Sequence, residues 1–588
     1  MAALLVVALL AMAGLSVRAL QLQAIEAPAY AASAAERMAV THDLLPTRGR
    51  ITDRNGVVLA QSQPAVLVTV DPLLISRNGI SLNQKMTRSQ QERAAKAPRA
   101  VAEILARHLG GSAEDYRDTV TKKDGDGHLL SYVIVRHQVP SYTFDQIRKD
   151  MAKGPWYGVF ASNDPVRTYP GQGTAANVVG FVNHEGTGAG GLEYTLDKSL
   201  RGTKGKETYD SLAWGRIPLG STTLVPAVDG TSYTLTLDAQ MQQMTQKALT
   251  SAVKATKAES GEAIMMNVKT SEVLAMASAP SFNPNDLTKA TEGQIRNRAI
   301  SDNYEPGSVQ KVLTMAALVD KGLVTPDTKV RIPARLASGG GHITDAFDHG
   351  TIGLTARGII ANSSNIGTSL LVRKLDKKDL VSYLHDFGLG RPTGIGLPGE
   401  AKGTVPPASM ADYTRDQISF GQGLSVTAIQ EAAAVAGIVN GGVYHAPTII
   451  RSATDGNGEP VELPKPASRR VVKASTSAQV LDMMESVVTL HDDRAVPGYR
   501  TAGKTGTAQR VDPRCHCYRG YTASYVSVGP VEDPAILTYV VLNNPSEGHQ
   551  GSEVALPVAR QLMSVALPRY GVEPSTTPAR KEPLEYKP

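Results

Sequence analysis

The run Glu305-Pro-Gly-Ser308-Val-Gln-Lys311 places a hydroxyl and an amine at the start of an apolar segment. Its proline and glycine are turn residues. Residues 312–319 are almost entirely apolar, which predicts a helix that is buried on most sides and ends near Gly322. Positions i and i+3 share a helix face, so Ser308 and Lys311 are expected one turn apart at the amino-terminal end of this helix.

A hydroxyl beside an amine becomes an activated nucleophile if the amine can be neutral. Lysine ordinarily titrates near ~10.4, and a base that works at neutral pH needs a pKa of roughly 7–8, so the surroundings must supply about 4 kcal/mol. The helix amino terminus supplies only about 0.3–1 kcal/mol. We therefore expect burial of Lys311 and a second nearby cation to supply the rest.

The Ser-x-x-Lys pattern alone is weakly informative. Ser251 and Lys254 also fit it, within a polar run over residues 240–257 that predicts a solvated helix face. A serine that caps a helix, with a lysine at the surface, is the structural alternative for Ser308 and Lys311. Further motifs are needed to decide between these interpretations.

Two further motifs follow in the chain. Ser363-Ser-Asn365 comes at the end of a short helix predicted for residues 355–362, and Lys504-Thr-Gly-Thr507 precedes two predicted strands. Ser-x-Asn also occurs at residues 81–83, 281–283 and 301–303, but none of these follows the Ser308 helix. The ordered set of three motifs is far more specific than any one of them.

The ordered motifs resemble those of class B penicillin-binding proteins, which are membrane-anchored peptidoglycan D,D-transpeptidases, and in particular the septal, FtsI-like type. The resemblance covers nearly the whole chain. No segment resembles the glycosyltransferase domain of class A relatives. Four further stretches carry the resemblance, three in the amino-terminal half and one in the carboxy-terminal half: residues 48–56 (Arg-Gly-Arg-Ile-Thr-Asp-Arg-Asn-Gly), 167–170 (Arg-Thr-Tyr-Pro), 191–193 (Gly-Leu-Glu) and 420–423 (Phe-Gly-Gln-Gly).

This resemblance implies a role for each motif residue. Ser308 attacks the carbonyl between the two terminal D-alanines of a stem peptide, giving an acyl-enzyme and free D-alanine. Lys311 takes the hydroxyl proton, and Ser363 relays it towards the leaving amine. Asn365 orients the peptide. Lys504 is the second cation, which lowers the pKa of Lys311 and holds the substrate carboxylate.

The Lys-Thr-Gly-Thr strand is implied to bind substrate. The Thr505 and Thr507 hydroxyls bind the terminal carboxylate, and Gly506 leaves space for the acyl chain. Backbone N–H groups of Ser308 and Thr507 form an oxyanion hole, worth about 3–4 kcal/mol per donor. The acyl group then passes to an amine of a neighbouring stem peptide. A β-lactam mimics the terminal dipeptide and remains on Ser308. The resemblance implies no cofactor.

Residues 1–17 are almost wholly apolar. At 1.5 Å per residue this run covers about 25 Å, slightly less than the ~30 Å hydrocarbon core. We predict an uncleaved single-pass anchor over residues 1–20, with the rest of the chain outside the cell. A cleaved signal peptide is the alternative, because Ala29-Tyr30-Ala31 offers a small-x-small site.

The remaining chain predicts an α+β protein of several parts. A helical stalk is expected over residues 21–47 and an irregular α+β pedestal over 48–228. A transpeptidase sandwich of helices and antiparallel sheet is expected over 229–570. Residues 571–588 are polar and rich in Pro and Lys, which predicts a disordered tail. Within the pedestal, Asn55-Gly56 indicates a hairpin.

Two clusters could in principle bind a metal. Cys515 and Cys517 are the only cysteines and are separated by one residue, so we expect two free thiols rather than a strained disulfide. The second cluster has the donor types of a metal site but is expected to be structural, so that no metal site is predicted: His342, Asp345, Asp348 and His349.

The net charge of +6 suits an anionic surface such as a membrane or cell wall. With 5% aromatic residues and no basic block interleaved with them, the sequence argues against a nucleic-acid partner. The resemblance implies an FtsW-type glycosyltransferase and other division proteins as partners. The alternatives are an elongation-type class B enzyme, a D,D-carboxypeptidase, a β-lactamase, or a catalytically silent β-lactam-binding scaffold or sensor.

Overall fold

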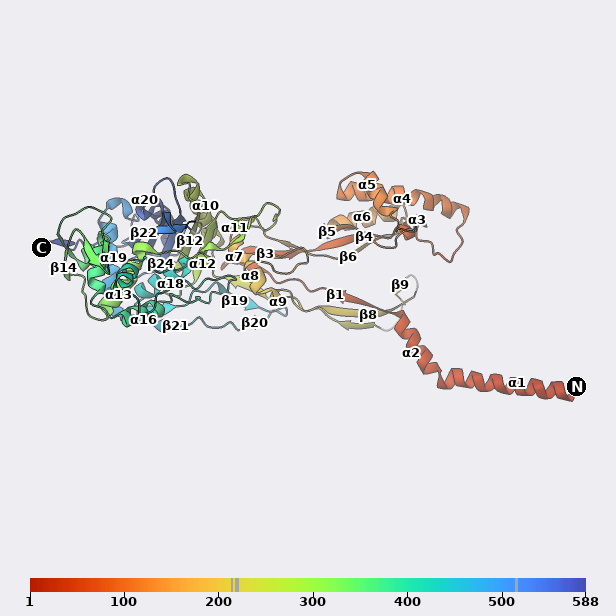
Figure 1. The fold of residues 1–588 in the computed structure, drawn as a ribbon. Coiled ribbons are helices and arrows are strands. Elements are labelled where there is room, and N and C mark those ends of the chain that lie inside the picture. Colours follow the sequence, from red (N-terminus) through yellow and green to blue (C-terminus); the bar gives the residue numbers. More distant parts are fainter. Residues whose placement is uncertain (213–214, 217–221, 513–514, 516, 588) are drawn as a thin grey trace.

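The computed structural model describes residues 1–212, 215–216, 222–512, 515 and 517–587. The molecule is elongated (Figure 1): a large carboxy-terminal body occupies one end, and extended strands connect it to a small lobe and to the amino-terminal helix at the other end.

The amino-terminal helix α1 (Ala2–Leu20) continues into a π-helical turn, η1 (Gln21–Ile25). Residues 2–24 form a helix long and apolar enough to cross a membrane, and no part of it is buried in protein. The helix is roughly 35 Å long and therefore exceeds the ~30 Å thickness of the hydrocarbon core, which residues 1–17 alone would not span. It is the one such candidate among the described residues.

The predicted helical stalk is only partly helical. Helix α2 (Ala27–Met38) fits the prediction, but residues from Ala39 onwards form strand β1 (Ala39–Leu44). Strand β1 pairs antiparallel with β8 (Gly205–Leu212), which also pairs with β10 (Thr222–Val225). The prediction failed here because the partner strand lies more than 160 residues further along the chain.

A six-stranded sheet crosses the boundary predicted near Asp229. Strand β2 runs parallel to β11, so the segments before and after residue 229 share backbone hydrogen bonds. Asn55-Gly56 turns the chain between β2 and β3, as predicted. The strands in sheet order are β20 (Pro460–Val461), β19 (Ile450–Thr454), β11 (Ser232–Leu235), β2 (Ile51–Thr52), β3 (Val58–Gln63) and β7 (Val166–Thr168).

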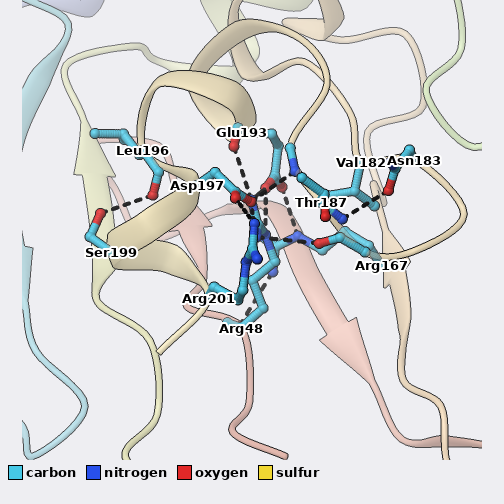
Figure 2. Close-up of polar contacts among 12 residues, drawn as sticks. Arg48, Arg167, Val182, Asn183, Thr187, Glu193, Leu196, Asp197, Ser199 and Arg201 are labelled. Atoms are coloured by element: carbon cyan, nitrogen blue, oxygen red, sulfur yellow. Dashed lines mark hydrogen bonds and ion pairs between the residues drawn. The ribbon is translucent and has the colours of Figure 1, made fainter. Parts of the chain in front are cut away.

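A buried cluster of charges joins three of the predicted pedestal motifs (Figure 2). Arg48 binds Glu193 with Nη2–Oε2 of 2.6 Å, and Arg167 Nε donates to the other Glu193 oxygen at 2.7 Å. Arg48 also pairs with Asp197 at 2.7 Å. The Glu193 side chain is fully buried. One carboxylate thus holds β7 and the segment before β2 against α8 (Gly191–Thr195).

The small lobe has its own hydrophobic core. Strand β4 is central in its three-stranded sheet, and Val68 and Val70 face the helices. The elements of this lobe are β4 (Ala65–Val70), α3 (Pro72–Ser76), α4 (Arg88–Leu109), α5 (Ala113–Val120), β5 (Val133–Pro140), α6 (Ser141–Lys153) and β6 (Val159–Asn163).

The carboxy-terminal body is built on a five-stranded antiparallel sheet with β22 at one edge. Successive side chains of a strand point to opposite faces. Ala263 and Met265 therefore share a core with α10 (Ala239–Ala255) and α21 (Leu556–Arg569), whereas Ile264 and Met266 share one with α13 (Gln310–Asp320) and α18 (Ala428–Val439). The strands in sheet order are β13 (Val273–Ala279), β12 (Ser260–Asn267), β24 (Ile536–Asn543), β23 (Cys517–Gly529) and β22 (Ala502–Asp512).

The helices of the body begin where their caps predict. Asp238 accepts N–H groups of Gln240 and Met241 at the start of α10, and Thr427 with Gln430 forms the capping box of α18. The longer helices are α10 (Ala239–Ala255), α13 (Gln310–Asp320), α15 (Asn365–Val372), α16 (Lys377–Asp386), α17 (Asp412–Ser419), α18 (Ala428–Val439), α19 (Ala474–Thr489) and α21 (Leu556–Arg569).

The carboxy-terminal tail is ordered, so the prediction of disorder is wrong. Strand β25 (Glu585–Tyr586) pairs antiparallel with β17 (Ile352–Thr355), and the Thr355 N–H donates to the Leu584 carbonyl at 3.0 Å. Gly358 makes room for this backbone, since a Cβ there would lie 1.9 Å from the Leu584 oxygen. A polar composition predicts disorder because the segment has little apolar surface to bury. It gives no information about an unpaired strand edge elsewhere in the fold, with which the tail can pair.

Removal of residues 582–588 is expected to lower the free energy of unfolding of the body by about 1–3 kcal/mol, because the Thr355 N–H loses its partner. Gly358→Ala is expected to destabilise in the same direction by displacing Leu584. Gly350→Ala is the matched control, because a Cβ there meets nothing within 4 Å. Thermal denaturation measures the effect, and an unchanged midpoint for both altered proteins would contradict it.

Candidate active site

Ser308 lies in a single 3-10 turn, η2 (Gly307–Val309), that leads directly into α13. Gly307 has φ +59°, and a Cβ there would come within 3.0 Å of the Thr507 backbone. Glycine therefore allows the turn to lie against strand β22. Ser308 itself is half-buried, whereas α13 behind it is buried along almost its whole length, as predicted.

Lys311 extends from the first turn of α13 to the Ser-x-Asn motif. Its Nζ donates to the Ser363 carbonyl at 2.5 Å and to Asn365 Oδ1 at 2.8 Å, and lies 3.2 Å from Ser363 Oγ. The side chain is fully buried. Lys311 is therefore not a surface residue, and the structural alternative for it is wrong.

Lys504 approaches the same hydroxyl from the edge strand β22. Its Nζ donates to Ser363 Oγ at 2.9 Å and to the Thr505 carbonyl at 3.1 Å, and it is also fully buried. The Ser363 hydroxyl thus lies between two lysine amines from distant parts of the chain. The structure brings all three motifs together at one point.

Burial lowers the pKa of Lys311 to about 7, and the negative charge of Asp345 opposes this shift. Burial is also the main cause that holds the pKa of Lys504 well below its ordinary value, and the charges of Lys311 and Arg494 add to it. The predicted lowering of the Lys311 pKa by burial is thus confirmed. The contribution of the Lys504 charge to that shift stays a prediction.

Ser363 adopts a left-handed backbone with φ +58°. Such a conformation is uncommon for a residue with a side chain and persists where the surroundings hold it. Here the Lys311 amine holds the Ser363 carbonyl, and Asn365 is fixed at both ends, since its Nδ2 donates to the Thr344 carbonyl at 3.0 Å. Contacts within the protein thus hold the Ser-x-Asn motif in place.

Asp345 is a site residue that the sequence identified only as a metal candidate. Its buried carboxylate accepts from Ser364 Oγ at 2.6 Å and from the Ile366 N–H at 2.9 Å, and pairs with His349 at 3.1 Å. It therefore fixes the start of α15 next to Ser363. No local pattern could have revealed this, because Asp345 is separated from the motif by 19 residues.

The substrate-strand residues lie along β22. Thr507 Oγ1 accepts the Gly551 N–H at 3.2 Å, and both Thr505 and Thr507 remain partly exposed. A Cβ on Gly506 would lie 2.2 Å from Ser524 Oγ and 2.9 Å from the Pro306 carbonyl. Glycine is therefore needed at this position for the strand to approach the Ser308 turn.

Two other expectations concern residues outside the site. Ser251 and Lys254 are exposed on α10, as predicted for a solvated face. Cys515 and Cys517 form a disulfide, so the prediction of two free thiols is wrong. The two Cα atoms lie 5.2 Å apart, within the usual disulfide range.

The geometry defines a serine acyltransferase centre: a half-buried hydroxyl on a helix turn, two buried amines and an edge strand. Comparison with known proteins agrees. The penicillin binding protein transpeptidase domain matches residues 261–564, and the penicillin-binding protein dimerisation domain matches residues 43–235.

Curated relatives extend this match over most of the chain. The penicillin-binding protein PbpB of Mycobacterium tuberculosis is 33% identical, over 93% of this chain and 81% of that protein. The peptidoglycan D,D-transpeptidase FtsI of Escherichia coli K12 is 32% identical, over 90% of this chain and 84% of that protein.

Solved structures show the same architecture. Penicillin binding protein 3 of M. tuberculosis, complexed with ampicillin, gives a TM-score of 0.70 at 28% identity, over 93% of this chain and all of that one. Penicillin Binding Protein 2X of Streptococcus thermophilus gives 0.75 at 25% identity, over 91% of this chain and 83% of that one. The chain belongs to the class B penicillin-binding proteins and is a peptidoglycan D,D-transpeptidase.

Proposed function

We propose that this enzyme cross-links stem peptides through an acyl-enzyme on Ser308. The observation that supports this assignment most strongly is the meeting of Lys311, one turn after Ser308, and Lys504 at the Ser363 hydroxyl. A proton path between nucleophile and leaving group requires hydroxyl and amine groups in this order.

In the proposed reaction, neutral Lys311 removes the proton of Ser308 Oγ as the oxygen attacks the carbonyl of the penultimate D-alanine. The C–O bond forms, and the C–N bond to the terminal D-alanine breaks. The proton passes from Lys311 through Ser363 to the leaving amine, which departs as free D-alanine. Attack by a second stem-peptide amine reverses these proton transfers, forms the cross-link and frees Ser308.

Lys504, Thr505 and Thr507 are proposed to hold the terminal carboxylate. A carboxylate beside the Lys504 amine would raise the lowered pKa of that lysine, so substrate binding itself restores its charge. The backbone N–H groups of Ser308 and Thr507 are proposed to stabilise the oxyanion, since η2 lies against β22 at Gly307.

We also propose a cellular setting. Helix α1 anchors the chain in the cell membrane by a single span, and the body lies outside the cell. The relatives named FtsI and PbpB support a role in septal wall synthesis, with an FtsW-type glycosyltransferase and other division proteins as partners. Imaging of a tagged protein in dividing cells tests this role, and labelling spread along the lateral wall would favour an elongation-type enzyme.

Labelling of the full-length protein with a fluorescent penicillin, followed by mass spectrometry of the labelled peptide, tests the assignment of Ser308. A stable adduct on Ser308 is expected, with none in Ser308→Ala and an unchanged adduct in Ser251→Ala. Rapid turnover of the penicillin would identify a β-lactamase. The absence of any adduct would favour a silent scaffold, and an adduct elsewhere would remove Ser308 from the mechanism.

The Asp345 carboxylate is expected to influence the pH dependence of acylation. Its charge raises the pKa of Lys311, so Asp345→Asn should lower that pKa and extend activity to lower pH. The rate should fall at the same time, because the single amide oxygen of Asn replaces the two oxygens that accept from Ser364 and Ile366. The acylation rate measured from pH 5 to 9 tests this. Asp348→Asn, an exposed neighbour, is the control.

A further inference from the structure

His349 is a buried histidine close to the Ser-x-Asn motif that the proposed reaction does not use. It lies in the loop between β16 (Gly341–Ile343) and β17, and its side chain is only 7% exposed. Nδ1 lies 2.6 Å from the Gly350 carbonyl oxygen, and Nε2 lies 3.1 Å from Asp345 Oδ2. Both partners can only accept hydrogen bonds, so the two contacts together require a proton on each ring nitrogen. The imidazole thus ties two points of the loop together.

The same loop supplies the contact that orients the Asn365 side chain. The carbonyl of Thr344, the residue before Asp345, accepts Asn365 Nδ2 at 3.0 Å. Asn365 Oδ1 accepts the Lys311 amine at 2.8 Å. These contacts fix which way round the amide lies, because its oxygen needs a donor and its nitrogen needs an acceptor. The amide nitrogen carries two hydrogens, so one N–H of this half-buried side chain remains for a ligand.

Asp345 connects the loop to the motif. Its buried carboxylate accepts Ser364 Oγ at 2.6 Å and the Ile366 N–H at 2.9 Å, both from the motif side. The His349 imidazole is its donor from the loop. Residues 346–348 are exposed, so packing does little to hold this part of the chain. Loss of the imidazole would leave the buried carboxylate short of a donor, and this end of the loop is then expected to move.

We propose that His349 is a positioning residue for Asn365. By holding Asp345 it keeps the neighbouring Thr344 carbonyl against the Asn365 amide, so that the second N–H of this amide is available to an amide carbonyl of the substrate. The proposal rests on the function proposed above and on the orienting role that the family resemblance implies for Asn365. It adds a residue, outside the three motifs, that controls recognition of the substrate amide.

Two β-lactams separate this role from a general effect on the fold. Benzylpenicillin carries a side-chain amide carbonyl, whereas 6-aminopenicillanic acid has the same ring system without that group. The second-order rate at which each compound acylates Ser308 is measured in the full-length protein by competition with fluorescent penicillin. The ratio of the two rates reports recognition of the amide, because a change in the Lys311 base or in folding alters both rates alike.

His349→Ala is expected to lower the ratio of the benzylpenicillin rate to the 6-aminopenicillanic acid rate by about tenfold, equivalent to ~1.4 kcal/mol. His349→Gln keeps an N–H donor for Asp345 and should retain part of the ratio. His342→Ala, which removes an exposed histidine in β16, should leave it unchanged. Asn365→Ala should lower the ratio as well, and adding His349→Ala to it should have no further effect, because the two residues act through one contact.

An unchanged ratio in His349→Ala would overturn the proposal. An equal fall of both rates, or loss of labelling by both compounds, would overturn it too, because His349 would then only support the fold. A further fall of the ratio in the double variant would mean that His349 acts through a group other than Asn365. Failure of both compounds to acylate Ser308 in the unaltered protein would instead contradict the proposed function.

Discussion

Lys311→Met is expected to slow acylation of Ser308 by benzylpenicillin by about 10²–10⁴-fold, the usual contribution of a general base. Methionine has a similar length and no charge to bury, so it fills the space of the buried Lys311 side chain, although the Ser363 carbonyl and Asn365 Oδ1 lose their donor. The fold should therefore persist while the proton acceptor is lost.

The measurement is the second-order rate of fluorescent penicillin labelling, with Lys254→Met on the exposed face of α10 as the control. In the unaltered protein the same rate should rise with pH through about 7, because only the neutral amine accepts a proton. It should be roughly tenfold lower at pH 6 than at pH 8. A Lys311→Met protein that labels at the original rate would exclude Lys311 as the base.

Glu193→Gln is expected to lower the free energy of unfolding by about 3–5 kcal/mol, the usual result of removing one partner of a buried ion pair. Arg48 and Arg167 both bind this carboxylate, and Arg167 Nη2 already has no partner among the described residues. Glutamine carries no negative charge, so Glu193→Gln leaves the two buried guanidinium groups next to a neutral amide.

Denaturant unfolding measures this effect, and Glu185→Gln in the exposed loop nearby is the matched control. If Glu193→Gln lowers the stability strongly while Ser308 is still labelled under native conditions, then Glu193 stabilises the fold and does not take part in catalysis. Equal unfolding midpoints for the Glu193 and Glu185 variants would mean that the cluster in Figure 2 contributes little to stability.

Elements with strong local signals were predictable from sequence. The apolar run of α13, the Asp238 cap of α10 and the capping box of α18 each depend on residues within one or two turns, and the structure confirms them. The same local signals did not indicate that Glu431, within α18, is buried. Its buried carboxylate has no hydrogen-bond partner among the described residues, and burial raises its pKa to about 8.

Features that depend on contacts between distant segments were not predictable. Local sequence gave no sign that Asp345 fixes the Ser364 turn, or that Gly358 leaves room for Leu584. The meeting of Lys311 and Lys504 was predicted from the motif order. The lowering of the Lys311 pKa by burial was predicted as well, whereas the burial of Lys504 could be judged only from the folded chain.

The position of β25 has a practical consequence for work on this protein. Leu584 rests on Gly358, five residues before Ser363, so any fusion at the carboxy terminus emerges close to the helix that leads to Ser363. A fluorescent reporter attached there risks pulling the strand from its sheet and altering antibiotic response and catalysis together. Reporters for imaging are better attached at the amino terminus, ahead of α1 and at the opposite end of the molecule (Figure 1).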